Sequence, residues 1–193
     1  MFFYVHGYGD YGSRYAYIGK FLAKHGYEMA GVDQRGFGCS EGMEGKIESY
    51  ETNSEDNYTF HERYVEEYNY LQGVPIFIIS GSFGGQLALY CHLARPDFYS
   101  GLLLGAPYFK HRDEDGQRKV MPLVRLIAKC FNRHALMNFG YDTRQKAHVE
   151  HWDLDPKHIG MRISMHTLIE FVRSLDNINE NKLFERVKIP ILL

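Results

Sequence analysis

A serine in a glycine-rich turn is the residue best placed to do chemistry. The segment Ser80–Gly85 (SGSFGG) separates a short apolar run, Ile76–Ile79, from a helical pattern, Gln86–Ala94. A tight strand-to-helix turn lifts a serine hydroxyl off the sheet, so Ser82 is a candidate nucleophile. The turn needs small residues two positions before and after the nucleophile, and Ser80 and Gly84 stand there. Serine in the first of these positions is a mild departure from G-x-S-x-G. Alone, the motif equally fits an ordinary glycine-rich turn.

Apolar runs alternate with helical patterns along the chain, which is typical of βα units around a parallel sheet. We expect strands over Phe2–Val5, Tyr27–Val32, Ile76–Ile79, Gly101–Leu104 and Val187–Leu193, and helices over Ser13–His25, Ser54–Leu71 and Gln86–Ala94. Between the last two strands the pattern changes to a charged segment and two amphipathic helical patterns: Lys110–Arg118, Met121–Phe131 and Ile159–Leu175. This stretch is too long for a loop, since such loops usually run about 2–6 residues. We therefore predict an α/β core over 1–109, an inserted helical cap over 110–186 and the start of a further core strand over 187–193.

Several further motifs stand in register with the serine turn. The segment His6-Gly7-Tyr8-Gly9 follows the first apolar run, the loop Asp33–Gly42 follows the second, and the cap contains the segment HWDLDP at 151–156. In this order and spacing, HGYGDYGSRY, DQRGFGCSEG, SGSFGG and VKIPILL resemble the monoacylglycerol lipase and serine aminopeptidase group of α/β-hydrolases. The resemblance spans essentially the whole chain. It implies the α/β-hydrolase fold, with a mostly parallel sheet flanked by helices and an inserted helical cap.

The resemblance also implies a mechanism. Ser82 would attack a carboxylic ester, and the backbone amides of Tyr8 and Phe83 would hold the oxyanion. Six residues would support the turn and its neighbouring loops: His6, Gly7, Asp33, Arg35, Gly84 and Gly85. The implied substrate is a small-molecule or lipid ester such as a monoacylglycerol, and no cofactor is implied. Thioesters, lysophospholipids and peptides use the same machinery, so the motifs do not choose among them.

The triad acid and histidine are expected beyond Leu193. In the family order, the acid follows the strand that begins near Ile189, and the histidine follows the next strand. We therefore expect the 193 residues to be a fragment, truncated at both ends and inactive on its own. The five strands would then be the middle of an eight-stranded sheet with two unprotected edges. Such edges favour pairing with other chains, so we expect poor solubility or oligomers.

Other titratable residues have simpler explanations. Asp113 and Asp115 lie where some hydrolases of this fold carry the acid, but a solvated charged segment explains them better. The cap histidines His148, His151 and His158 lack the accompanying Cys or Glu pattern of a zinc site, so we expect no metal.

Composition restricts the partners. A net charge of −2 and a pI near 6.5 argue against nucleic-acid binding. The three widely spaced cysteines include no CxxC pair, which favours a reducing compartment. We expect neither a signal peptide nor a transmembrane run, hence a cytoplasmic protein that could contact membranes through its cap. Five apolar cap residues could serve that contact or line an acyl channel, although packing onto the sheet is commoner: Val120, Leu123, Val124, Leu126 and Ile127.

Two other functions stay open at this point. Gly7-x-Gly9-x-x-Gly12 follows a strand, and Asp33 ends the next strand about 20 residues on, as in dinucleotide-binding proteins. That interpretation leaves the serine turn and the DQRGFGCSEG loop unexplained. A non-catalytic hydrolase relative or remnant that binds a lipid or a partner protein would explain the missing acid and histidine, but not the intact serine turn.

Overall fold

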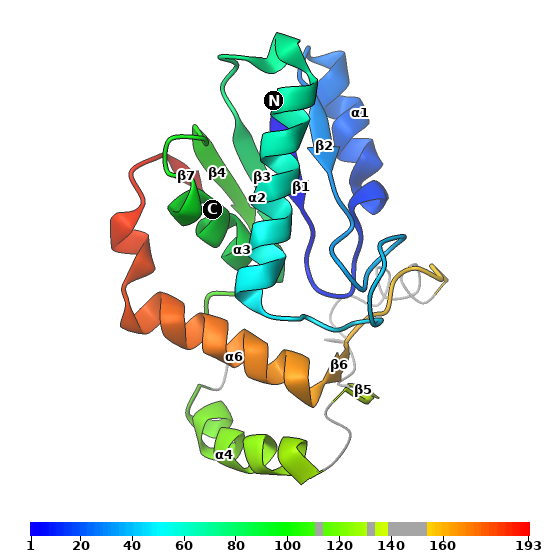
Figure 1. Ribbon diagram of the computed structural model, residues 1–193, viewed down its shortest axis with the longest axis vertical. Coiled ribbons are helices and arrows are strands. Elements are labelled where there is room, and N and C mark those ends of the chain that lie inside the picture. Colours follow the sequence, from blue (N-terminus) through cyan, green and yellow to red (C-terminus); the bar gives the residue numbers. More distant parts are fainter. Residues whose placement is uncertain (111–113, 131–133, 139–153) are drawn as a thin grey trace.

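The central element is a parallel sheet of five strands in the order β2-β1-β3-β4-β7 (Figure 1). The computed structural model describes residues 1–110, 114–130, 134–138 and 154–193. The strands of the sheet are β1 Phe2–Val5, β2 Met29–Gly31, β3 Phe77–Gly81, β4 Gly101–Gly105 and β7 Ile191–Leu192. Because all five are parallel, the loops that follow them leave from the same edge of the sheet. The predicted α/β class and parallel sheet are confirmed.

Helices flank the sheet and cross its carboxyl edge. Their bounds are α1 Ala16–Lys24, α2 Tyr50–Glu67, α3 Phe83–Ala94, α4 Glu114–Cys130 and α6 Met165–Glu180, with 3-10 turns η1 Gly12–Tyr15, η2 Asn69–Leu71 and η4 Leu183–Arg186. A separate antiparallel pair joins β5 Leu136–Asn138 to β6 Arg162–Ser164. None of the described helices is both long and apolar enough to span a bilayer.

The two faces of the sheet are covered by different helices. Successive strand side chains point to opposite faces. Phe3 stacks on His61 of α2 with ring centroids 4.1 Å apart, whereas Tyr4 stacks on Tyr15 of η1 at 4.2 Å. Helix α2 therefore lies on one face and η1 on the other. Helix α3 shares the face of α2 and packs on β1, β3 and β4.

Capping serines determine where α2 and α6 start, and the hydrophobic pattern predicted both starting residues wrongly. Helix α2 begins at Tyr50 rather than at Ser54, because Ser49 Oγ accepts a hydrogen bond from Thr52 N at 3.0 Å. The pattern over Ile159–Leu175 is not one helix. Its first part contains β6, and α6 begins only after Ser164, whose Oγ accepts from Thr167 N at 3.1 Å.

The predicted cap contributes both to the core and to the surface. Helix α6 crosses the carboxyl edge of the sheet (Figure 1), and Ile159, Ile163 and Phe171 belong to the same buried cluster as the strands. Helix α4 instead packs on α6. The expectation that its apolar stripe packs onto the sheet is wrong for three members, which are 52%, 57% and 59% exposed: Val120, Leu123 and Leu126. The boundaries of the cap stay a prediction.

Candidate active site

Ser82 occupies a strained turn between β3 and α3. Its φ of 51° and ψ of −123° lie in a region that costs a non-glycine residue about 1–3 kcal/mol. Backbone hydrogen bonds hold the turn in place. Ser82 N donates to the Gly105 carbonyl at 3.1 Å, and the Ser82 carbonyl accepts from Gly85 N and Tyr108 N, both at 3.0 Å. The serine is exposed, and its side chain does not cap α3. The fold therefore presents this hydroxyl at the carboxyl edge of the sheet.

The glycines around Ser82 allow close backbone approach. A β-carbon at Gly84 would lie 2.2 Å from the Val5 carbonyl oxygen, and one at Gly85 would lie 2.7 Å from the Pro107 β-carbon. Neither contact is sterically possible, so the first turn of α3 can reach β1 and the loop after β4 only with glycine at these positions. Ser80, in the place of the motif's usual first glycine, is buried at 3% exposure.

The segment after β1 lies directly against the nucleophile. A β-carbon at Gly7 would lie 3.1 Å from the Gly81 carbonyl oxygen and 3.2 Å from Ser82 Cβ. Phe83 is the first residue of α3, so its N–H has no acceptor one turn earlier in the helix. The structure thus brings Gly7, Ser82 and the N-terminus of α3 together. The N-terminus of a helix favours negative charge.

Both ring nitrogens of His6 are engaged by the backbone, so this side chain is not placed to act as a base. Its Nδ1 lies 2.8 Å from the Gly7 carbonyl oxygen, and its Nε2 accepts from Gln34 N at 2.9 Å. A carbonyl accepts and an amide donates, so the proton is on Nδ1 and the ring is neutral. Burial lowers the pKa of His6, which also favours the neutral form.

Gln34 is a site residue that sequence reasoning missed. It is 3% exposed, and its side-chain amide donates to the His6 carbonyl at 2.7 Å, while its backbone N–H binds the His6 ring. Two hydrogen bonds from one residue therefore fix the residue before Gly7. The feature of the sequence that could have indicated Gln34 is its position immediately after Asp33, in the loop that follows β2.

Asp33 and Arg35 shape the loop at the end of β2. The Asp33 carboxylate accepts from Gly12 N at 2.7 Å and from Cys39 N at 2.8 Å. Arg35 forms a bidentate ion pair with Asp56 of α2, at 2.6 and 2.7 Å. That hydrogen-bonded pair raises the pKa of Arg35 further. Both residues support the loop through these contacts.

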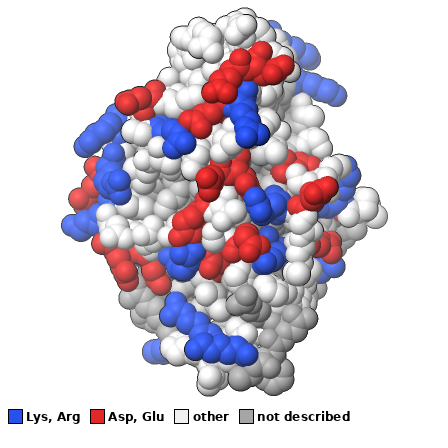
Figure 2. Space-filling model, viewed as in Figure 1, with Lys and Arg blue, Asp and Glu red and all other residues white. Residues whose placement is uncertain are grey.

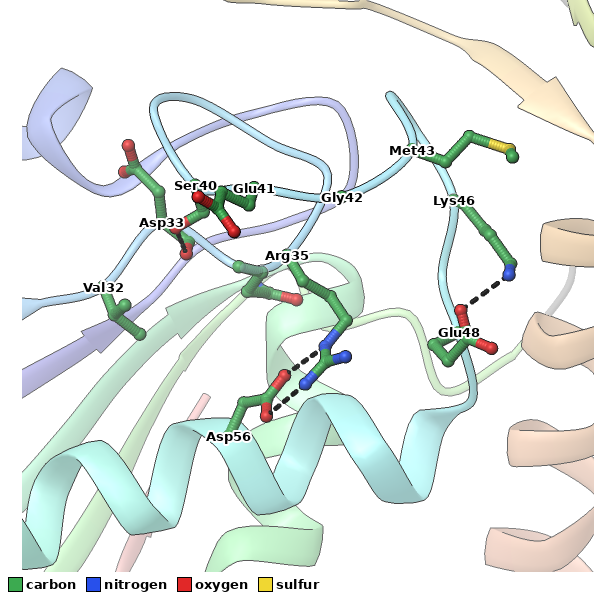
Figure 3. A pocket seen from close by; sticks show the side chains of 11 residues that line it. Val32, Asp33, Arg35, Ser40, Glu41, Gly42, Met43, Lys46, Glu48 and Asp56 are labelled. Carbon is green, nitrogen blue, oxygen red and sulfur yellow. Dashed lines mark hydrogen bonds and ion pairs between the residues drawn. The ribbon is translucent and has the colours of Figure 1, made fainter.

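A polar cleft of about 520 Å³ lies between this loop and α2 (Figure 3). Figure 3 shows Arg35 directed at Asp56 and Lys46 directed at Glu48, and the second pair is 2.6 Å apart. Ser82 does not line this cleft. Its two cations, Arg35 and Lys46, are both held in ion pairs, and we assign the cleft no part in the chemistry.

Phe171 is a second residue that the sequence did not single out. From α6, its ring contacts Phe83 at 4.6 Å, Tyr8 at 5.2 Å and Tyr108 at 6.2 Å between centroids. An aromatic wall therefore stands beside the serine turn. Helical periodicity marked Phe171 as apolar, but it did not indicate that its neighbours lie 63 to 163 positions earlier in the chain.

Several residues that the sequence suggested for the site lie outside the described part of the chain. Asp113, His148 and His151 are not among the described residues, and the side chain of Asp115 is not described. In the described part of the chain, no group of three or more His, Cys, Asp or Glu side chains could hold a metal ion.

Comparison with known proteins decides the family. The family model described as serine aminopeptidase, S33, matches residues 1–193. The chain belongs to this family. It is 32% identical over 107 residues to an uncharacterized abhydrolase domain-containing protein of Dictyostelium discoideum, covering 55% of the chain and 11% of that protein. It is 21% identical to the monoglyceride lipase of Rattus norvegicus over 197 residues, covering 100% of the chain and 63% of the lipase. The chain thus spans less than two thirds of the length of either relative.

The fold of this S33 family member is also that of a solved lipase. A soluble variant of monoglyceride lipase from Saccharomyces cerevisiae, in complex with a substrate analog, superposes with a TM-score of 0.78 at 23% identity. The match covers 98% of this chain and 65% of that one. The family and the fold favour the hydrolase over the dinucleotide-binding interpretation. Its expected ribose-binding acid, Asp33, instead accepts hydrogen bonds from the backbone amides of Gly12, at the start of η1, and Cys39, in its own loop.

Proposed function

We propose that Ser82 is the nucleophile of a hydrolase that cleaves carboxylic esters. The observation that carries the proposal is the positive φ of Ser82 at a strand-to-helix turn, with Gly7 packed against its β-carbon. This geometry sets the N-terminus of α3 and the segment after β1 on either side of the Ser82 turn. It is the arrangement expected of an oxyanion site beside a nucleophile.

In the proposed reaction, Ser82 Oγ attacks the ester carbonyl, and a histidine takes the serine proton. The N–H groups of Tyr8 and Phe83 bind the oxyanion, and each such donor is worth about 3–4 kcal/mol in comparable enzymes. The histidine returns the proton to the leaving alcohol, and water then hydrolyses the acyl-enzyme. From the family order we propose that the histidine and its acid lie beyond Leu193. The 193 residues alone would then turn over very slowly.

The proposed substrate is a lipid-like ester such as a monoacylglycerol. The aromatic rings of Phe171, Tyr8 and Tyr108 beside the serine turn favour a substrate with an apolar acyl chain over a polar peptide. The names of the lipase relatives support the same class.

A substrate panel tests this proposal. The full-length gene product should hydrolyse a long-chain monoacylglycerol faster than an aminoacyl anilide, and Ser82→Ala should abolish both activities. Faster hydrolysis of the anilide would contradict the lipid substrate and indicate a peptide substrate. A folded protein that hydrolyses neither substrate, yet binds the monoacylglycerol, would favour the non-catalytic alternative.

We also propose that α4 is the surface through which the protein contacts membranes. The exposed apolar residues Val120, Leu123 and Leu126 share this helix with three exposed cations, Lys119, Arg125 and Lys129. Figure 2 shows basic side chains, without acidic neighbours among the described residues in view, at the end of the molecule where α4 lies. Such a helix face suits a bilayer with anionic headgroups.

Vesicle co-sedimentation tests the contact. Binding should be stronger to vesicles containing phosphatidylserine than to pure phosphatidylcholine, and Leu123→Glu should weaken it about tenfold by removing apolar burial and adding a repelled charge. Phe21→Glu is the matched control, because Phe21 is 62% exposed on α1. Equal loss with both variants would contradict a specific role for α4.

A further inference from the structure

Asp155, in the HWDLDP motif, has no role in the site as described so far, yet it joins two distant segments. Its Oδ2 accepts from the Tyr11 hydroxyl at 2.6 Å and lies 3.4 Å from Arg14 Nη1. Its Oδ1 accepts from Lys157 N at 3.0 Å. Only 21% of the Asp155 side chain is exposed, against 18% for Arg14. One carboxylate therefore holds both the loop after β1 and the start of the segment leading to β6.

The residues that follow Asp155 contact Tyr8 and Gly9, which belong to the segment that we propose binds the oxyanion. Ile159 N donates to the Gly9 carbonyl at 3.0 Å, and a β-carbon at Gly9 would lie 2.4 Å from the Gly160 carbonyl oxygen. The Tyr8 hydroxyl lies 2.6 Å from the Arg162 carbonyl oxygen and 2.8 Å from the Gly45 carbonyl oxygen, and its one proton is shared between these two acceptors. Tyr8 is thus held through its side chain and through the residue that follows it.

The groups around Asp155 keep its carboxylate ionised at neutral pH, which favours its contacts with Tyr11 and Arg14. Burial would raise the pKa of Asp155, but the hydrogen bonds from Tyr11 and Lys157 N and the charge of Arg14 outweigh it and lower that pKa. The hydrogen bond to Asp155 raises the pKa of Tyr11 to about 12, so its hydroxyl remains a donor.

We propose that Asp155 is a positioning residue that sets the Tyr8 N–H beside Ser82 by latching the 155–162 segment onto residues 8–14. The inference rests on the proposed function, since it assigns the Tyr8 N–H to the oxyanion. Small displacements matter there, because a shift of about 1 Å can cost about a hundredfold in rate.

The test is fluorophosphonate inactivation of the full-length gene product, resolved into a rate constant, an apparent affinity and an end-point. Asp155→Asn and Tyr11→Phe remove one partner each, and Asp97→Asn makes the same chemical change at an exposed site beyond α3. Both latch variants should lower the inactivation rate constant about tenfold, with affinity and end-point unchanged. The double variant should be no slower than the slower single variant, because both changes break one contact.

If Asp155 and Tyr11 only stabilised the fold, their variants would lower the end-point of labelling, which measures the amount of folded protein. The inactivation rate constant would stay unchanged. Hydrogen exchange at the Ile159 amide, the donor to Gly9, should also speed up in both latch variants but not in Asp97→Asn. Latch variants with the rate constant of the control would overturn the latch while leaving the proposed function intact. A wild-type protein that does not label at all would remove the proposed function, and this inference with it.

Discussion

The two ring nitrogens of His6 are both occupied, and this settles what that side chain can do. It donates from Nδ1 to Gly7 and accepts at Nε2 from Gln34, so it organises the backbone beside Ser82 rather than moving protons. The sequence predicted the serine turn and its glycines because those constraints are local. It did not predict Gln34 or Phe171, because their partners lie 28 or more positions away and depend on how the strands pair.

Gln34→Leu tests how far Gln34 stabilises the backbone around His6. The variant leaves the buried His6 carbonyl without its side-chain donor, so the free energy of unfolding should fall by about 1–3 kcal/mol. Urea denaturation measures the change. Gln72→Leu is the control and should cost less than about 0.5 kcal/mol, because Gln72 is exposed and its bond lies at the end of α2. Equal losses would show that Gln34 has no special role.

Side-chain caps set the ends of the helices, and they explain where sequence-based prediction failed. Hydrophobic periodicity places α1, α2 and α3 within a few residues, but Ser49 and Ser164 determine where α2 and α6 start. The pattern over Ile159–Leu175 merges a strand with a helix because both bury apolar residues against the same core. An amphipathic stripe likewise does not specify its partner, which is why α4 was expected on the sheet.

Thr167 ties α6 to the loop before α2, and its removal should loosen that contact. Its hydroxyl donates to the Gly45 carbonyl and accepts from Ile47 N, both at 3.1 Å. Thr167→Val leaves the buried Ile47 N–H unpaired and removes one of the two donors to the Gly45 carbonyl, so we expect a loss of about 1–3 kcal/mol in unfolding free energy. Thr59→Val on α2 is the control, since it is only partly buried and makes the same substitution within a helix. A loss below about 0.5 kcal/mol in thermal or urea unfolding would contradict this role.

At the scale of the whole molecule, the alternation of apolar runs and helical patterns predicted the parallel sheet correctly. The motifs in register predicted the family, because the carboxyl edge of a parallel sheet gathers loops that are distant in sequence. The same packing buries polar side chains. His61 of α2 lies at 0% exposure against Phe3, with Nδ1 2.8 Å from the Tyr99 hydroxyl.

Buried neutral histidines should make the fold acid-sensitive. Burial lowers the pKa of His61 to about 3 and also lowers the pKa of His6 and His92. Below about pH 6.5 the unfolded chain binds protons that the folded chain does not, so stability is lost as the pH falls from about 6.5 toward 3. His61 alone adds a slope of about 1.4 kcal/mol per pH unit in that window.

His61→Phe tests this account by urea denaturation at pH 6, 5 and 4. The variant keeps an aromatic ring against Phe3 and should reduce the slope by about 1.4 kcal/mol per pH unit. His25→Phe makes the same substitution at an exposed position and is the control. Identical slopes for wild type and His61→Phe would contradict a neutral, buried His61.

Covalent labelling of Ser82 tests the central claim most directly. A fluorophosphonate probe is added to the folded full-length gene product, to the 193-residue chain, and to the Ser82→Ala and Ser100→Ala variants, and the labelled residue is identified by mass spectrometry. We predict labelling at Ser82 in the full-length wild type and in Ser100→Ala, none in Ser82→Ala, and much slower labelling of the 193-residue chain. Failure of the folded full-length protein to label, or labelling at another residue, would contradict the assignment of Ser82 as the nucleophile.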